Sequence, residues 1–169
     1  VTKKTDALGK VTTITYDANN NPLSRTDALS NVTNFTYDAN GNLTKTTDAL
    51  SNAVNITYSA SGLPQTITDA RSNVTTNTYD AQGNLLQVAA PLGNATTFTY
   101  DVAGRRLTKT DALSHTTAYS YDNNDNLLSV TDAATNTDIY SYDENNNRIS
   151  ARDKNANLTQ FVYDQKDLL

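Results

Sequence analysis

The sequence predicts an all-β fold: tandem 21-residue β-hairpin repeats forming one long antiparallel, curved or spiral sheet, a solenoid-like shell segment. Three observations predict this class. Tyrosine recurs every 21 residues without insertion or deletion, aspartate recurs in phase with it, and each period holds two short extended runs separated by two turns. The tyrosines are Tyr16, Tyr37, Tyr58, Tyr79, Tyr100, Tyr121, Tyr142 and Tyr163. Residues 1–169 are therefore interpreted as a single array of about eight repeats, and we expect it to be a fragment of a larger protein.

One repeat illustrates the predicted elements. Residues 43–47 form a first extended run, residues 48–52 interrupt it, residues 53–58 form a second run, and residues 59–62 interrupt that. Connections this short join antiparallel neighbours, since parallel strands need longer crossovers. Because strand twist accumulates, a sheet of about sixteen such strands is expected to curve.

The second run of each repeat has the clearer alternation. Two residues before each tyrosine stand Ile14, Phe35, Ile56, Asn77, Phe98, Tyr119, Tyr140 and Phe161, and the intervening position is mostly Thr or Ser. Apolar groups are thus expected on one face and small hydroxyls on the other. Asn77 breaks the apolar series, so its repeat is expected to be the weakest.

Both turns carry residues suited to tight backbone reversal. Four residues after the tyrosines stand Asn20, Gly41, Gly62, Gly83, Gly104, Asp125, Asn146 and Asp167, residue types that tolerate positive φ. The aspartate after the tyrosine, as in Asp38, Asp80 and Asp122, can accept backbone N–H bonds within its turn. The other turn reads Thr-Asp-Ala-Leu-Ser-Asn in several copies, with aspartate at Asp6, Asp27, Asp48, Asp69, Asp111, Asp132 and Asp153. The fifth repeat departs from it, with Ala89-Ala90-Pro91-Leu92-Gly93.

Composition excludes several function classes. The net charge of −5 and scattered basic residues argue against a nucleic-acid partner. No apolar run reaches transmembrane length, so membrane insertion is not expected, and the absence of cysteine excludes a disulfide scaffold.

Catalytic, metal and cofactor sites are not expected, and we predict that the chain is not an enzyme. The single histidine, His115, occupies a turn position that is asparagine in most other repeats. The carboxylates recur in every unit, whereas an active site needs one asymmetric constellation. The loops that begin at Asp122 and Asp143 space oxygen ligands as calcium loops do, but neither has a glutamate at the twelfth position.

The tyrosine ladder has two interpretations. Rings repeated in every unit are most simply the core of the sheet, packed across neighbouring strands. In that case Tyr100→Ala should cost about 3–5 kcal/mol. The alternative is a cell-surface adhesin or carbohydrate-binding module, in which Tyr119, Tyr121, Tyr140 and Tyr142 stack on sugar rings.

The repeat resembles the tyrosine–aspartate (YD) repeat of the Rhs family. The resemblance rests on Tyr37-Asp38-Ala39-Asn40-Gly41-Asn42-Leu43, Tyr79-Asp80-Ala81-Gln82-Gly83-Asn84-Leu85 and Tyr100-Asp101-Val102-Ala103-Gly104-Arg105-Arg106-Leu107. It extends over essentially the whole chain. It implies a hollow shell of wound β-sheet, as in Rhs-type polymorphic toxins, insecticidal toxin complexes, wall-associated proteins and teneurins.

The resemblance also implies a function, a location and partners. The segment would be a non-enzymatic part of a shell wall that encloses or displays a toxin, an effector or another domain, in a secreted or cell-surface bacterial protein. Its partners would be flanking repeats and that domain. Because end strands expose unpaired backbone, self-association of the fragment is also expected.

Overall fold

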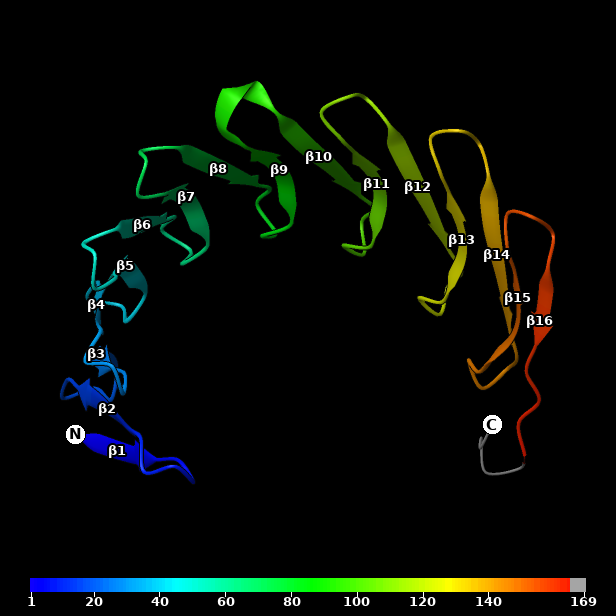
Figure 1. Cartoon of the computed structure of the whole chain (residues 1–169). Helices are drawn as coiled ribbons and strands as arrows, with labels where there is room; N and C mark the ends of the chain where they lie inside the picture. Colours follow the sequence, from blue (N-terminus) through cyan, green and yellow to red (C-terminus); the bar gives the residue numbers. More distant parts are fainter. Residues whose placement is uncertain (165–169) are drawn as a thin grey trace. The chain divides into compact units, whose positions relative to one another are not determined.

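The computed structural model describes residues 1–164, which are all-β apart from one 3₁₀ turn, η1 (Pro91–Gly93) (Figure 1). Two compact units are present, one of residues 1–78 with 89–93 and one of residues 79–88 with 94 onward. The first contains β1 (Thr2–Thr5), β2 (Val11–Tyr16), β3 (Pro22–Thr26), β4 (Val32–Tyr37), β5 (Leu43–Thr47), β6 (Ala53–Tyr58), β7 (Pro64–Thr68) and, except for its last residue, β8 (Val74–Tyr79). The second contains β9 (Leu85–Ala89, except for its last residue), β10 (Ala95–Tyr100), β11 (Arg106–Thr110), β12 (Thr116–Tyr121), β13 (Leu127–Thr131), β14 (Thr137–Tyr142), β15 (Arg148–Arg152) and β16 (Leu158–Gln160).

Within each unit, the strands follow one another in chain order and pair antiparallel with their neighbours. The predicted all-β class built from consecutive antiparallel hairpins is confirmed. The expected runs 43–47 and 53–58 coincide with β5 and β6. Period-2 alternation predicted these strands, because one face of each strand is more polar and the other face is more apolar.

A β-bulge lies where six of the repeat tyrosines end their strands. Thr99 pairs with Thr108, but the next residue, Tyr100, pairs with Arg106, so Leu107 is the extra residue on β11. The same register shift follows Thr15, Thr36, Thr57, Ser120 and Ser141. A bulge bends its strand and redirects the next side chain, so each tyrosine leaves the sheet at the start of a turn.

The sheet has no buried core among residues 1–164: no apolar or polar side chain in this part of the chain is buried. One face carries the half-buried apolar residues that precede the tyrosines, such as Phe35, Ile56 and Phe98. The other carries paired hydroxyls: Oγ1 of Thr57 lies 2.6 Å from Oγ1 of Thr66. Equivalent pairs are Thr15–Ser24, Thr99–Thr108, Ser120–Ser129 and Ser141–Ser150.

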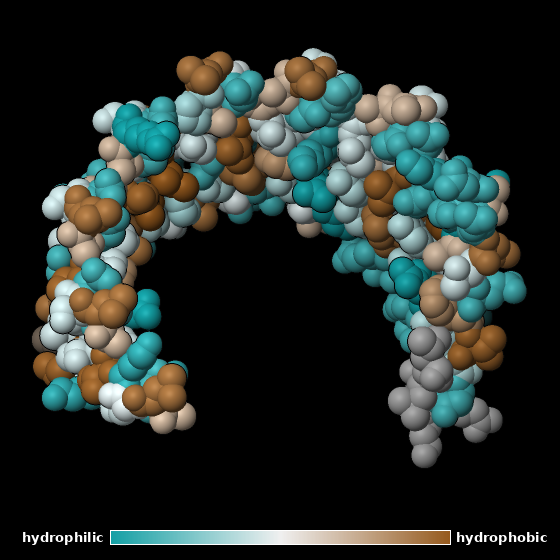
Figure 2. Space-filling model, viewed as in Figure 1, coloured by the Kyte–Doolittle hydropathy of each residue, from teal (hydrophilic) through white to brown (hydrophobic). Residues whose placement is uncertain are grey.

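Hydrophobic groups occur at separated places among hydrophilic ones on the face shown in Figure 2. With so little burial, the hydrogen bonds of the strands and turns carry an unusually large share of the stability.

None of the helical segments among the described residues has the length and apolar character needed to cross a membrane.

Candidate functional site: the tyrosine–aspartate turns

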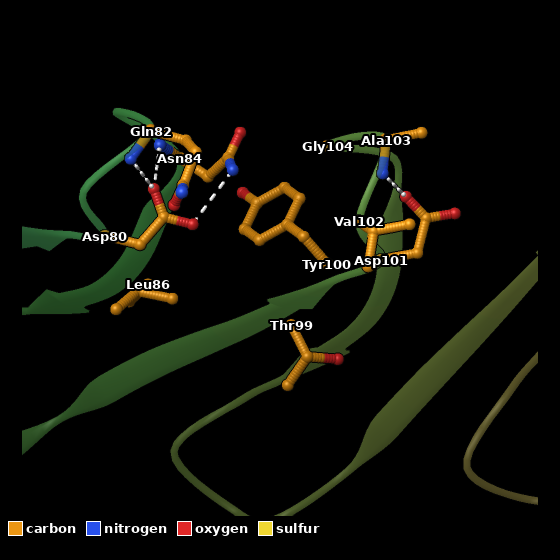
Figure 3. Close-up of a pocket in the computed structure, with 10 residues that line it drawn as sticks. All are labelled: Asp80, Gln82, Asn84, Leu86, Thr99, Tyr100, Asp101, Val102, Ala103 and Gly104. Carbon is orange, nitrogen blue, oxygen red and sulfur yellow. Dashed lines mark hydrogen bonds between the residues drawn. The ribbon is translucent and has the colours of Figure 1, made fainter.

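Each tyrosine–aspartate turn is organised by its aspartate. Oδ1 of Asp80 accepts hydrogen bonds from the backbone N–H groups of Gln82 (3.0 Å) and Asn84 (2.8 Å), and Oδ2 accepts one from Nδ2 of Asn84 at 2.9 Å (Figure 3). The backbone N–H of Asp80 donates to the Asn84 carbonyl, and the N–H of Gly83 donates to the Asp80 carbonyl. Backbone donors that leave the sheet ladder at the turn are thereby satisfied.

These bonds favour the ionised carboxylate. For Asp80, the hydrogen bond from the Asn84 side chain is the largest influence and lowers the pKa, and desolvation opposes it. Desolvation is the largest influence on Asp101 and Asp143, but the donated hydrogen bonds together still hold the pKa of each below 3.8. The pKa is lowered in the same way at Asp17, Asp27, Asp38, Asp48, Asp69, Asp111, Asp122, Asp132 and Asp153.

The turn position four residues after tyrosine has a left-handed backbone. The values of φ are 82° at Gly41, 78° at Gly62, 89° at Gly83 and 81° at Gly104. Asn20, Asp125 and Asn146 take the same conformation at the equivalent position. Asp167, which shares this position in the sequence, lies outside the described residues.

The second turn of most repeats uses the same hydrogen bonds with less suitable residues. Asp48 binds the N–H groups of Leu50 and Asn52 and the Asn52 side chain, while Ser51 has φ of 66°. Ser30, Ser72, Ser114, Thr135 and Ala156 share that positive φ. Sequence reasoning missed this conformation because serine rarely adopts it. The repeated Asp-x-x-x-Asn spacing was the signal that could have revealed it.

Five tyrosine hydroxyls donate a hydrogen bond to a backbone carbonyl fifteen residues earlier in the chain. Tyr100 donates to the carbonyl of Leu85 at 3.0 Å and Tyr58 donates to that of Leu43 at 2.8 Å. Tyr121, Tyr142 and Tyr163 donate likewise to Arg106, Leu127 and Arg148. Figure 3 shows the Tyr100 ring between the turn at Asp80 and the turn at Asp101, with its hydroxyl end toward Asn84. The Tyr100 ring therefore spans the gap between two successive turns.

Asn77 stands in the apolar series without leaving its amide unpaired. Its Nδ2 donates to the carbonyl of Pro64 at 3.1 Å. The polar side chain thus recovers a hydrogen bond where the other repeats place an apolar group, which reduces the expected weakness of this repeat.

A groove lies beside Tyr100. It is lined by Asp80, Gln82, Asn84, Leu86, Thr99, Tyr100, Asp101, Val102, Ala103 and Gly104 (Figure 3). The carboxylates of Asp80 and Asp101 are already occupied by turn N–H groups. Both carboxylates therefore help to close their turns.

Arg105 joins two successive turns in the second unit. It replaces the usual asparagine, and its Nε lies 2.7 Å from Oδ2 of Asp101. Its Nη1 reaches the next turn, at 2.6 Å from the Asp122 carbonyl and 2.9 Å from Oδ1 of Asp125. The guanidinium also lies 5.2 Å from the centre of the Tyr121 ring. The hydrogen bond to Asp101 is the main cause of the raised pKa of Arg105.

We expect Arg105→Asn to lower the melting temperature by about 1–3 °C and Arg105→Ala to lower it further. The asparagine side chain can still donate to Asp101, as the asparagines of other repeats donate to their own turn aspartates. It is too short to reach Asp125. Because the lost contacts are ionic and partly exposed, 1 M NaCl should reduce the difference between wild type and variant. Thermal unfolding followed by circular dichroism measures both effects. Equal melting temperatures for all three proteins at low salt would contradict the bridging role.

The tyrosines proposed for sugar stacking have cations over their rings. The guanidinium of Arg106 lies 4.5 Å from the Tyr119 ring centre, and that of Arg148 lies 5.7 Å from the Tyr140 ring centre. With Arg105 over Tyr121, three of the four rings have one face engaged. Tyr142 uses its hydroxyl on Leu127.

His115 takes the role of the turn asparagine. Its Nδ1 lies 3.0 Å from Oδ2 of Asp111, and its N–H donates to Oδ1 of the same residue. Within residues 1–164, no group of three or more His, Asp or Glu side chains is placed to hold a metal ion.

The turn of the fifth repeat differs as its sequence suggested. It contains η1 in place of the aspartate turn, with Leu92 fully exposed and at φ of 67°. At Ser59, where other repeats have the aspartate, Oγ accepts only the N–H of Leu63 at 3.2 Å. At both sites the chain still reverses direction, but fewer side-chain hydrogen bonds stabilise the turn.

Comparison with known proteins identifies the repeat. A family model described as RHS Repeat matches residues 1–29, 16–53, 58–95, 79–116, 104–137 and 121–158. No curated protein matches the chain.

Solved structures have the same fold. The crystal structure of TcdB2-TccC3-Cdc42 is 19% identical over 92% of this chain, with a TM-score of 0.77. The crystal structure of TcdB2-TccC3 without its hypervariable C-terminal region is 17% identical over 93%, with a TM-score of 0.76. A Photorhabdus luminescens Tc holotoxin pore with a TccC3 mutation is 20% identical over 85%, with a TM-score of 0.69. The chain spans only 10%, 10% and 9% of those chains, and at these identities the likeness shows the fold alone.

Proposed function

The chain belongs to the RHS repeat family, and from this we propose that it forms part of the wall of a β-sheet shell that encloses or displays a toxin, an effector or another domain. Family membership and the shared fold support a structural role for the repeat. The more specific proposal, that this wall encloses another domain, is supported by the architecture of the sheet.

The observation that carries the proposal is a single-layer sheet in which no side chain of residues 1–164 is buried and the same turn closes nearly every hairpin. A globular binding domain concentrates its apolar residues in one interior. Here, each repeat contacts mainly the repeats beside it, and the hairpins can continue in register for any length. A sheet of this kind is suited to form a wall that separates the inside of a shell from the outside.

We also propose that the chain has no catalytic activity of its own. The turn aspartates accept hydrogen bonds from turn N–H groups, as Asp80 does, and five of the repeat tyrosines, Tyr100 among them, donate to backbone carbonyls. Polar groups engaged in this repeated way have little freedom to act as acid, base or nucleophile.

The proposed partners are flanking repeats and the enclosed or attached domain. The similar structures contain TcdB2 and TccC3, one of them with Cdc42. We propose a secreted or cell-surface location for this protein.

Protease protection tests the enclosure. In the longest natural protein that contains these residues, we expect the region C-terminal to the repeats to resist a nonspecific protease in buffer. It should become cleavable at the urea concentration at which the repeats open. Mass spectrometry of the fragments locates the cuts. Tyr100→Ala should shift this opening to lower urea, while Tyr100→Phe should shift it much less, because phenylalanine retains the ring.

Immediate cleavage of the C-terminal region while the repeats stay intact would overturn enclosure. A structural role without enclosure would then remain, and binding of glycans to Tyr119 and Tyr140 would become the function to measure.

A further inference from the structure

The second turn carries an exposed leucine at its tip in three consecutive repeats, whereas the equivalent residue of the next repeat is Arg71. In the first unit, Leu8, Leu29 and Leu50 are 83%, 80% and 84% exposed, and each follows an alanine. They belong to the turns between β1 and β2, β3 and β4, and β5 and β6, which all leave the sheet on the same side. We call this side, defined by these three residues, the leucine edge.

The turns at the opposite ends of the strands provide a matched comparison. Their tips carry Asn19, Asn40 and Ser61, which define the asparagine edge. The N–H groups of Asn19 and Asn40 bind Oδ1 of the turn aspartate at 2.8 and 2.9 Å, and those of Leu8, Leu29 and Leu50 do so at 2.9, 2.8 and 2.9 Å. The same turn geometry therefore accepts a polar tip. Hairpin closure does not explain the leucines.

Surface leucines are common singly but not in a regular row. Neighbouring strands are about 4.8 Å apart, so tips on alternate connections recur about every 10 Å. A partner must present apolar groups at that interval to engage all three leucines. The leucine edge of a second copy has the same spacing because its sequence is the same. Three leucine–leucine contacts can therefore form at the same time.

We propose that the leucine edge is an interface for a second copy of this chain, with the two edges antiparallel about a two-fold axis. Leu29 then lies against Leu29 of the second copy, and Leu8 lies against Leu50. This is the self-complementary arrangement that most homodimers use. The aspartate turns hold the tips in place before association, so little conformational entropy is lost.

The available surface is enough for a weak specific contact. Three exposed leucines and their alanines offer on the order of 500 Å² on each copy, and burying both sets reaches about 1,000 Å², the lower limit for specific interfaces. Each copy carries a net charge of −5, which opposes association. Added salt should therefore strengthen the dimer, because it screens this repulsion while the apolar contact remains.

Sedimentation velocity over a range of concentrations tests the proposal. We expect a dimer whose affinity rises in 0.5 M NaCl and falls at least 30-fold in the combined variant Leu8→Asn, Leu29→Asn, Leu50→Asn. Asparagine is the residue that the asparagine edge already uses, so the turns should persist, and the circular dichroism melt checks this. The matched control, Asn19→Ser, Asn40→Ser, Ser61→Asn on the asparagine edge, should leave dimerisation unchanged.

Cross-linking tests the two-fold axis. The chain has no cysteine, so one introduced thiol reports one position. Ala28→Cys, beside the axis, should form an intermolecular disulfide quickly under mild oxidation. Ala7→Cys and Ala49→Cys should do so only when mixed, because each lies opposite the other.

Two outcomes would overturn the proposal. One is a strict monomer at millimolar concentration in high salt. The other is a dimer that survives the triple asparagine substitution but is lost when Lys3→Pro blocks pairing at β1, which would assign association to the exposed end strand.

Discussion

Tyr100→Ala is expected to lower the free energy of unfolding by about 2–3 kcal/mol. The ring is half-buried between two turns, and its hydroxyl bonds the Leu85 carbonyl at 3.0 Å. Alanine removes both contacts. The expected loss is smaller than the 3–5 kcal/mol that a fully buried aromatic core residue would give, since no side chain among residues 1–164 is buried.

Urea unfolding followed by tyrosine fluorescence and circular dichroism measures this loss. Tyr100→Phe is the control: it removes only the hydroxyl and should cost about 1 kcal/mol. If the alanine variant loses less than about 1 kcal/mol, the ring does not hold the turns together, and the structural interpretation of the ladder fails.

Acid unfolding is the second large effect. The pKa of twelve turn aspartates lies below the ordinary 3.8 in the folded chain, because turn N–H and asparagine groups donate to the carboxylates. A group whose folded pKa is lowered contributes stability above its unfolded pKa and loses it as pH falls through the folded pKa. Stability should therefore be nearly constant from pH 7 to pH 5 and fall steeply below about pH 4.

Urea midpoints measured between pH 7 and pH 2 show the expected curve. Asp38→Asn with Asp80→Asn provides a matched control: these amides keep an oxygen acceptor but cannot be protonated in this range. The double variant should start less stable at pH 7 and lose less on acidification. A wild-type midpoint that stays constant down to pH 2 would contradict the role given to the carboxylates.

The repeat sequence predicted the fold because its signals are local. Alternation within residues 53–58 and the Tyr-Asp-x-x-Gly spacing are sufficient to predict a strand and a tight turn. The bulge at Tyr100 was not predicted, since register depends on how the turn closes against the next strand. The alternation predicted an apolar face, and in the structure the apolar residues of that face, such as Ile56 and Phe98, are half-buried.

The site was less predictable where partners come from other repeats. Arg105 bonds Asp125, twenty residues away, and nothing in the local sequence fixes that distance. The hydrogen bond from the Asn84 side chain to Asp80 was not predicted, because the sequence shows only that the two residues are four positions apart. The positive φ of Ser51 contradicts the usual preference of serine, and its neighbours' hydrogen bonds are what maintain it.

The tyrosine hydroxyl bond has a fixed reach of fifteen residues, from Tyr58 to Leu43 and from Tyr100 to Leu85. Since this is shorter than one 21-residue period, a genetic deletion or duplication of one whole period leaves each such bond with an equivalent donor and acceptor. Recombination between similar periods can therefore lengthen or shorten the sheet without requiring compensating substitutions. The length of such a sheet can then evolve in steps of two strands.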